Sequence, residues 1–208
     1  MRAAATYGMR MPPRLHVINL PRVPAGEGAP AGYSLAPCAN CAAPCCATLR
    51  ARLTTVEAQR IASALSVPLD DVVTRVPGAG HHHPWFTVPI PLADGPVTLA
   101  LRQRDGSRCA FLHEVGARGR CAIHALRPGV CRIYPYPVRE GTLRTDVGSA
   151  ELCPIGWAVD DAAERAVRRD MAAWRADIAR EEQHVARWAR QVPRRRTWER
   201  WTAWVSGA

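Results

Sequence analysis

Four of the eight cysteines in this chain lie within nine residues, in the stretch Cys38-Ala39-Asn40-Cys41-Ala42-Ala43-Pro44-Cys45-Cys46. The first two have the Cys-x-x-Cys spacing, at which one turn of chain brings two thiolates to one metal. Cys45 and Cys46 are adjacent, so their side chains point to opposite faces of a strand or about 100° apart on a helix. We therefore expect that these two rarely bind one single ion together. Either one faces a second site, or both bind different atoms of a multinuclear cluster, or one is structural.

Whether clustered cysteines are metal ligands or disulfides depends on the compartment. The segment from Met1 to Gly32 has no apolar run of about seven residues or more, which a secretory signal requires. Nothing downstream approaches the roughly 18 uninterrupted apolar residues of a membrane-spanning helix. We expect a cytoplasmic protein with reduced thiols, in which clustered cysteines are metal ligands or redox groups.

The other four cysteines are widely spaced, so they are expected to come from different elements that meet in space: Cys109, Cys121, Cys131 and Cys153. Two sets of four permit two tetrahedral zinc sites. They equally permit one iron–sulfur cluster with four ligands drawn from both sets, and the cluster type that we expect is 4Fe–4S. A thiolate-bound centre of either kind carries net negative charge. Three arginines adjacent to cysteines, Arg108, Arg120 and Arg132, could offset it.

The charged residues limit the chemistry further. The 208 residues include 28 basic side chains, all of them arginine, against 18 acidic ones, for a formal net charge of +10. Absence of lysine excludes a Schiff-base lysine, a lysine general base and a Walker-type phosphate lysine. Arginine without lysine is typical of a GC-rich genome, and we expect a bacterial protein. The positive charge leaves nucleic acid or an anionic surface open as a partner.

Local patterns predict a mixture of helices and short strands. Thr54 is a candidate N-cap with Glu57 in the capping-box position, which starts a helix that Pro68 ends. A second short helix is expected from Leu69 to Val76. Strands are predicted around residues 86–90 and 97–101, with turns at Asp94-Gly95 and Asp105-Gly106. Cys109 to His124 is predicted to form two arms joined by a turn at Gly116–Gly119.

The C-terminal third has helical periodicity. Apolar residues at three-four spacing run from Val159 to Val192, interrupted by Glu181. After Pro193, Trp198, Trp201 and Trp204 follow helical spacing beside four arginines. We favour a terminal helix that docks its tryptophans on the core, although an anionic membrane or a nucleic acid would also suit this composition.

These patterns together predict an α+β fold: a small metal-ligated domain with short strands and a long C-terminal helix. We expect three parts. Residues 1–36 form an extended or partly disordered leader with one short strand at Leu15–Leu20. Residues 37–158 form the cysteine-cluster metal-binding domain, and residues 159–208 form a helical segment packed on it.

The motifs resemble those of the YkgJ-like cysteine-cluster family, whose Cys-x-x-Cys-x(2–3)-Cys-Cys domain is described as zinc- or iron-chelating. The similarity extends from about Pro37 to Pro154 and continues beyond the signature. It includes Leu53-Thr54…Glu57…Arg60-Ile61-Ala62, then Asp105-Gly106…Cys109-Ala110-Phe111-Leu112, then Cys121-Ala122-Ile123-His124…Arg127-Pro128…Cys131-Arg132-Ile133-Tyr134-Pro135. His124 departs from the family, which usually has tyrosine there. The same domain occurs in flagellin lysine N-methylases, so the resemblance also implies a cluster-dependent methyl transfer as an alternative.

Several histidines and tyrosines near the cysteines are secondary candidates. His81-His82-His83 could supply a metal ligand, although a polar loop is the reading we favour. His113 and His124 follow cysteines and could act as ligands or proton donors, although packing or hydrogen bonding is favoured. Tyr134 and Tyr136 are expected to pack over the metal centre and exclude water.

Three functional hypotheses follow. The first is a metal-binding protein that holds an iron–sulfur cluster or zinc through cysteine thiolates, with a redox, metal-handling or scaffold role. The second is a cluster-dependent modifying enzyme such as a protein methyltransferase, for which no catalytic residue stands out. The third is a zinc-stabilised adaptor that binds nucleic acid or membrane through the Arg/Trp tail. A protein partner is compatible with each. The candidate metal ligands are Cys38, Cys41, Cys45, Cys46, Cys109, Cys121, Cys131 and Cys153.

Overall fold

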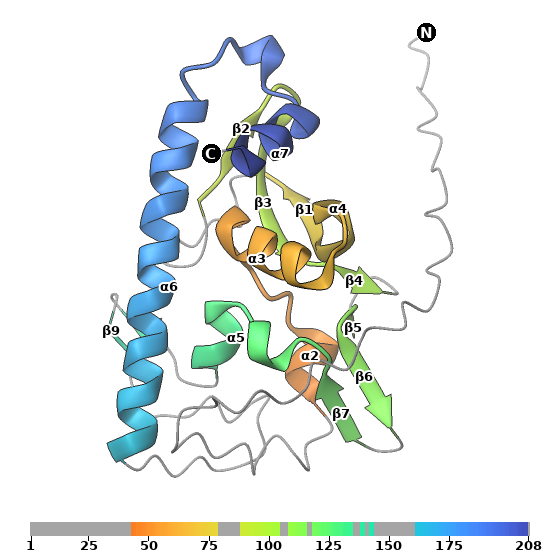
Figure 1. Cartoon of the computed structure of the whole chain (residues 1–208), viewed down its shortest axis with the longest axis vertical. Coiled ribbons are helices and arrows are strands. Elements are labelled where there is room, and N and C mark those ends of the chain that lie inside the picture. The colour runs from red at the N-terminus through yellow and green to blue at the C-terminus, as the bar shows by residue number, and fades with distance from the viewer. Residues whose placement is uncertain are drawn as a thin grey trace, which may run out of the picture.

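The computed structural model describes residues 43–78, 88–104, 108–115, 118–134, 138–139, 142–143 and 161–207 (Figure 1). Several predictions concern residues outside these ranges. They include the leader 1–36 with its strand at Leu15–Leu20, the histidines 81–83, Tyr136, and three of the eight cysteines, Cys38, Cys41 and Cys153.

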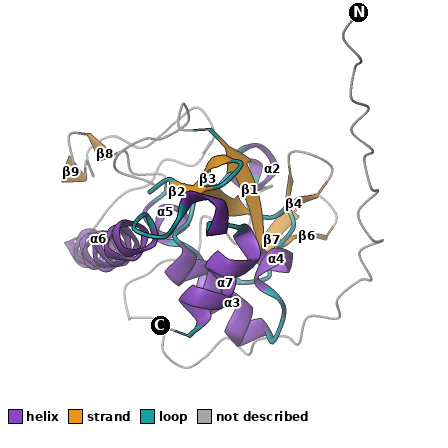
Figure 2. Ribbon diagram, turned by 90° about the horizontal axis from the view of Figure 1, so that it is seen from above, coloured by secondary structure: helices purple, strands orange, loops and turns teal. Residues whose placement is uncertain are grey.

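The described residues form helices and short antiparallel strands, which confirms the α+β fold. The helices are α2 (Pro44–Thr48), α3 (Thr55–Leu65), α4 (Leu69–Val72), α5 (Gly129–Ile133), α6 (Asp161–Trp188) and α7 (Trp198–Ser206), with single turns of 3₁₀ helix at His124–Leu126 and Pro193–Arg195. The long α6 runs along one side of the molecule. α2 and α5 lie near one end of it, and α7 lies near the other (Figure 1). The view along its axis shows α6 to one side of the strands (Figure 2).

The helix predicted from Thr54 forms as α3. The Thr54 side chain accepts a hydrogen bond from the Glu57 amide, and the Glu57 carboxylate accepts one from the Thr54 amide at 2.8 Å, which completes the capping box. The helix stops at Leu65, three residues before Pro68, because Ser66 adopts a left-handed conformation with φ of 54°.

The largest sheet has the strand order β1-β3-β2, with all pairs antiparallel: β1 (Val73–Pro77), β2 (Ile90–Leu92) and β3 (Gly95–Leu101). The turn predicted at Asp94-Gly95 joins β2 to β3, and Gly95 has a φ of 122°, which a side chain would disfavour. β2 pairs only with the start of β3. At the other end of β3, the Leu53 amide donates to the Leu99 carbonyl and the Leu101 amide to the Ala51 carbonyl.

One prediction in this region is wrong. The helix expected from Leu69 to Val76 ends at Val72, and Val73–Pro77 is strand β1. Val73 pairs with Leu101, and Val73 and Val76 are both buried. Sheet pairing with a strand distant in sequence therefore overrides the local helical pattern.

Short hairpins follow the main sheet, and two of them carry a cysteine each, Cys109 and Cys121. β4 (Gln103–Arg104) pairs with β5 (Arg108–Cys109), and β8 (Val138–Arg139) pairs with β9 (Thr142–Leu143). The two arms predicted between Cys109 and His124 form the hairpin of β6 (Leu112–Val115) and β7 (Arg118–Cys121), in which Leu112 pairs with Cys121.

The core has two parts that α6 connects. Near its C-terminal end, Trp188 joins α7 and the main core around Leu53, Ile61 and Leu99. Near its N-terminal end, α6 packs on α5 in a second cluster, made of Ile133, Val167, Met171, Trp174 and Ile178. The predicted apolar stripe of α6 is thus confirmed.

Between the two core parts lies a buried acidic seam, which we define as Glu57, Asp177 and Glu181. Glu181 Oε1 accepts hydrogen bonds from the Thr55 amide at 3.1 Å and the Thr55 hydroxyl at 2.5 Å. Asp177 forms ion pairs with Arg60 and Arg180. The charge of Glu181 suggested that it interrupts the buried face of α6. The residue is instead buried and belongs to that face.

The C-terminal tail docks on the domain as a capped helix, as favoured from its sequence. Thr197 caps α7, and the Trp198 indole donates to Asp70 Oδ1 at 2.7 Å. Trp198 and Trp201 are buried. The Ala93 amide after β2 donates to the Arg196 carbonyl, and the Trp188 indole donates to the Pro91 carbonyl. The tail therefore covers the outer edge of β2.

None of the helices within the described ranges is both long enough and apolar enough to cross a membrane.

Gly129 is expected to tolerate no side chain. A Cβ at this position would overlap the buried Trp174 ring of α6. We expect Gly129→Ala to lower the free energy of unfolding by about 1–3 kcal/mol, the usual cost of overpacking. Urea unfolding of the full chain measures this change. Gly207→Ala is the matched control, because its added Cβ would meet only ordinary contacts. Equal stability of the two variants would contradict this packing.

Glu181 is expected to make stability fall as pH rises. Burial, together with the charges of Glu57 and Asp177, raises the pKa of this carboxyl from 4.5 to about 7, although the hydrogen bonds from Thr55 lower it. The folded state therefore binds the proton more tightly than the unfolded state. The stabilisation is complete below about pH 4.5 and is lost towards pH 7, at about 1.4 kcal/mol per pH unit.

Glu181→Gln should flatten this dependence and raise the free energy of unfolding above pH 7, since the amide oxygen can still accept from Thr55. Denaturant unfolding at a series of pH values tests it. Glu182→Gln changes the exposed neighbour on the same helix and should leave the pH profile intact. Identical profiles for the two variants would rule out Glu181 as the source.

Candidate metal centre

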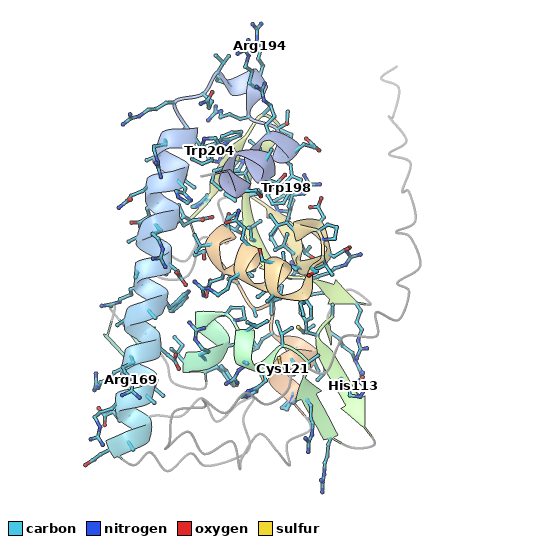
Figure 3. All side chains as sticks on the ribbon, viewed as in Figure 1. His113, Cys121, Arg169, Arg194, Trp198 and Trp204 are labelled. Carbon is cyan, nitrogen blue, oxygen red and sulfur yellow. The ribbon has the colours of Figure 1, made fainter. Side chains whose placement is uncertain are left out.

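Five of the eight candidate ligands lie in the described residues, and they gather at one end of the molecule. Cys45 and Cys46 are in α2, Cys109 ends β5, Cys121 ends β7, and Cys131 lies in α5. All five thiols are free. The Cys45, Cys109 and Cys121 thiols each act electrostatically on Cys131, so four chain elements bring their sulfurs to one region. Figure 3 shows Cys121 where α2, β7 and α5 approach one another.

Local structure explains how each element presents its cysteine. Ala43 adopts a left-handed conformation just before Pro44, and this turn starts the short helix that carries Cys45 and Cys46. α5 starts at Gly129, whose amide donates to Glu57 Oε1 at 2.6 Å. The carboxylate that caps α3 therefore also fixes the start of the helix that carries Cys131.

The adjacent cysteines are closer than their sequence suggested. Their Sγ atoms lie 4.0 Å apart and share a hydrogen bond. With Zn–S bonds of about 2.3 Å, two sulfurs of a tetrahedral zinc site are about 3.8 Å apart. The distance between the two sulfurs therefore allows both to bind one ion. The direction of adjacent side chains had led us to expect that this is rare.

Burial keeps most of these thiols protonated in the absence of a cation. It raises the pKa of Cys121 to about 11 and also raises the pKa values of Cys109 and Cys131. The shared hydrogen bond lowers the pKa of Cys45 to about 7 and raises that of Cys46. Several buried thiolates close together repel one another, which raises their pKa values. A bound metal cation would offset this repulsion and favour the deprotonated thiolates.

Arg127 is the arginine whose charge acts on most of these thiols. It is not next to a cysteine in the sequence, so sequence adjacency did not identify it. Its charge lowers the pKa values of Cys45, Cys121 and Cys131. Its Nε donates to the His124 carbonyl at 3.1 Å. Its place in the Arg-Pro motif was the one signal in the sequence that could have identified it.

Two of the three arginines expected to offset the thiolates have acidic partners instead. Arg108 pairs with Glu114 at 2.6 Å, and Arg132 pairs with Asp170 at 3.2 Å. The third, Arg120, is exposed and lies opposite His113 in the register of the β6–β7 hairpin. A neighbouring position in the chain therefore does not decide which charge faces the cysteines.

The secondary candidates take different positions. His113 lies on the exposed face of β6. His124 is partly buried, and burial lowers its pKa to about 4. Its Nε2 is buried and has no hydrogen-bond partner among the residues that the structure describes. Tyr134 follows α5 directly. Of these, His124 has the neutral, buried nitrogen that a role beside the metal would require.

The donor set fits a thiophilic metal in its chemistry but is incomplete within the described residues. No three of the described His, Cys, Asp and Glu side chains are placed to hold one ion. The remaining candidates, Cys38, Cys41 and Cys153, lie outside those ranges. Thiolates are the ligands that select zinc and iron–sulfur centres.

Neither the comparison with curated proteins nor the comparison with solved structures found a match. The comparison with protein families matches residues 37–154, which include all eight cysteines. The similarity inferred from the motifs is thereby confirmed. Over residues 37–154, the chain belongs to the CxxCxxCC family, described as "Putative zinc- or iron-chelating domain".

Proposed function

We propose that this protein binds a thiolate-ligated metal centre, an iron–sulfur cluster or zinc, and uses it in a redox, metal-handling or scaffold role. The observation that carries the proposal is the convergence of five free thiols from α2, β5, β7 and α5. Membership of a family described as zinc- or iron-chelating supports it. The cytoplasm, where thiols remain reduced, is the compartment that suits such a centre.

The number of thiols supports a centre with more than one metal atom. A tetrahedral zinc ion takes four ligands. Five free thiols lie in one region of the described residues, and Cys38, Cys41 and Cys153 would complete the proposed set of eight. A 4Fe–4S cluster with additional thiols nearby, or two zinc ions, would use these donors. A thiolate-bound cluster would give the protein a redox centre, whereas thiolate-bound zinc would stabilise the fold.

In this proposal residues 37–158 hold the metal and residues 159–208 close the domain around it. Support comes from the contacts of α6 with α5. Trp174 packs against Gly129, and Asp170 pairs with Arg132, the residue after Cys131. The C-terminal helix would thus hold one ligand-bearing helix in place.

The metal centre is tested by anaerobic purification of the full chain with metal analysis and a visible spectrum. An iron–sulfur cluster gives iron, acid-labile sulfide and a broad visible band that bleaches in air, and zinc gives a colourless, air-stable protein. For zinc, chelation should unfold the cysteine-bearing end, since binding of roughly 10–16 kcal/mol exceeds the stability of most domains. Protein that binds neither metal, even after reconstitution, would refute the proposal.

Arg127 should support metal retention more than Arg108 does. Its charge acts on three of the thiols, whereas Arg108 is paired with Glu114. We expect Arg127→Gln to weaken metal binding by roughly tenfold or more, the usual effect of losing a group that supports metal ligands.

Arg108→Gln is the matched control, because it removes the same charge beside Cys109 in sequence. Competition with a chromogenic chelator measures both affinities. If the two variants lose metal equally, Arg127 has no specific role at the centre.

A further inference from the structure

Arginines without an acidic partner are concentrated where α6 ends and α7 begins. Residues 187–200 contain six arginines and one glutamate, Glu199. In the part of the chain that the structure describes, none of these six forms an ion pair, whereas arginines between positions 60 and 180 pair repeatedly with carboxylates. We call this group the C-terminal basic surface: Arg187, Arg190, Arg194, Arg195, Arg196 and Arg200.

The backbone that carries this surface is held firmly. Trp201 is fully buried, and Trp198 is fixed by its hydrogen bond to Asp70. The Arg196 carbonyl accepts from the Ala93 amide at 2.9 Å. Figure 3 shows Arg194 extending away from the molecule at the end opposite Cys121. The positive charges are therefore displayed at fixed positions and far from the cysteines.

A hollow with aromatic walls opens beside these arginines. It has a volume of about 280 Å³ and is lined by Trp188, Gln191, Arg195, Arg200, Ala203 and Trp204. The Trp188 and Trp204 rings lie 5.8 Å apart, and the Arg187 guanidinium lies 5.9 Å from the Trp204 ring. Its size is just below that of typical small-ligand sites, so it suits one planar ring rather than a large molecule.

We propose that the C-terminal basic surface binds single-stranded nucleic acid. One base would enter the hollow and stack on Trp204, and the adjacent phosphates would lie on Arg195 and Arg200. Aromatic stacking combined with a positively charged track is the general mode by which single strands are bound. The guanidinium group matches a phosphate with two parallel hydrogen bonds. The four remaining arginines extend the contact along the strand.

An anionic membrane would also attract the charge of the C-terminal basic surface, but the apolar side chains that membrane binding needs are not available there. A helix that lies in the bilayer interface must present apolar residues to it. Trp198 and Trp201 are 4% and 0% exposed, and Val192, 50% exposed, is the only large apolar side chain described as exposed in this segment. Trp198 and Trp201 are thus committed to the core, which favours nucleic acid over lipid.

The test uses the intact full-length protein and a fluorescein-labelled oligouridylate of about twelve nucleotides, within the range of single-strand site sizes. Anisotropy is recorded over a series of salt concentrations. For Arg195→Gln/Arg200→Gln, the slope of log affinity against log salt should fall by about 1.4, since each phosphate contact on a single strand contributes about 0.7. Trp204→Leu should weaken binding roughly tenfold, and Trp204→Phe should retain most of the affinity.

The matched control is Arg165→Gln/Arg169→Gln, which removes the same charge from exposed positions near the start of α6. It should bind like the native protein. Equal losses in the two double variants would show non-specific charge attraction and overturn the proposal. So would uridine monophosphate binding as tightly as the oligonucleotide, or tighter binding to phosphatidylserine vesicles.

Metal content should be the same in every variant, so failure here is distinguishable from failure of the metal proposal. Circular dichroism confirms folding, and the arginine variants decide the test if Trp204→Leu does not fold.

Discussion

The buried carboxylate of Glu57 is the contact on which the cysteine-bearing end of the molecule depends. One oxygen closes the capping box of α3, and the other accepts from the amide that starts α5. α5 carries Cys131 and is pressed against Trp174 of α6. A single side chain thus sets three helices relative to one another. Desolvation of this carboxyl, which raises its pKa, is offset by these backbone donors.

The charges of the molecule are separated along its length. Thiols occupy one end, the buried acidic seam lies in the middle, and the C-terminal basic surface occupies the other end (Figure 3). Arg60 and Arg180 neutralise Asp177 at the seam, and Arg127 is left to act on the thiols. The net positive charge of the sequence is therefore not spread evenly, and each proposed site has a different electrostatic character.

Features with a local cause could be predicted from the sequence. The capping box at Thr54, the 112–121 hairpin and the apolar stripe of α6 each follow from residues close together in the chain. Features that depend on a distant partner could not. Residues 73–77 form a strand because Leu101 and its neighbours pair with them. Glu181 is buried because Thr55 supplies its hydrogen bonds. The five cysteines were identified by their motifs, but the positive charge that lowers the pKa values of Cys45, Cys121 and Cys131 comes from Arg127.

The covered edge of β2 has a consequence for how the protein is made. Pro91 and Ala93 obtain their hydrogen-bond partners from Trp188 and Arg196, about a hundred residues later. All three strands of the sheet are synthesised before these residues, and an unpaired strand edge is open to other strands until its partners dock. Closure of this edge therefore has to wait for Trp188 and Arg196, which follow the strand by about a hundred residues.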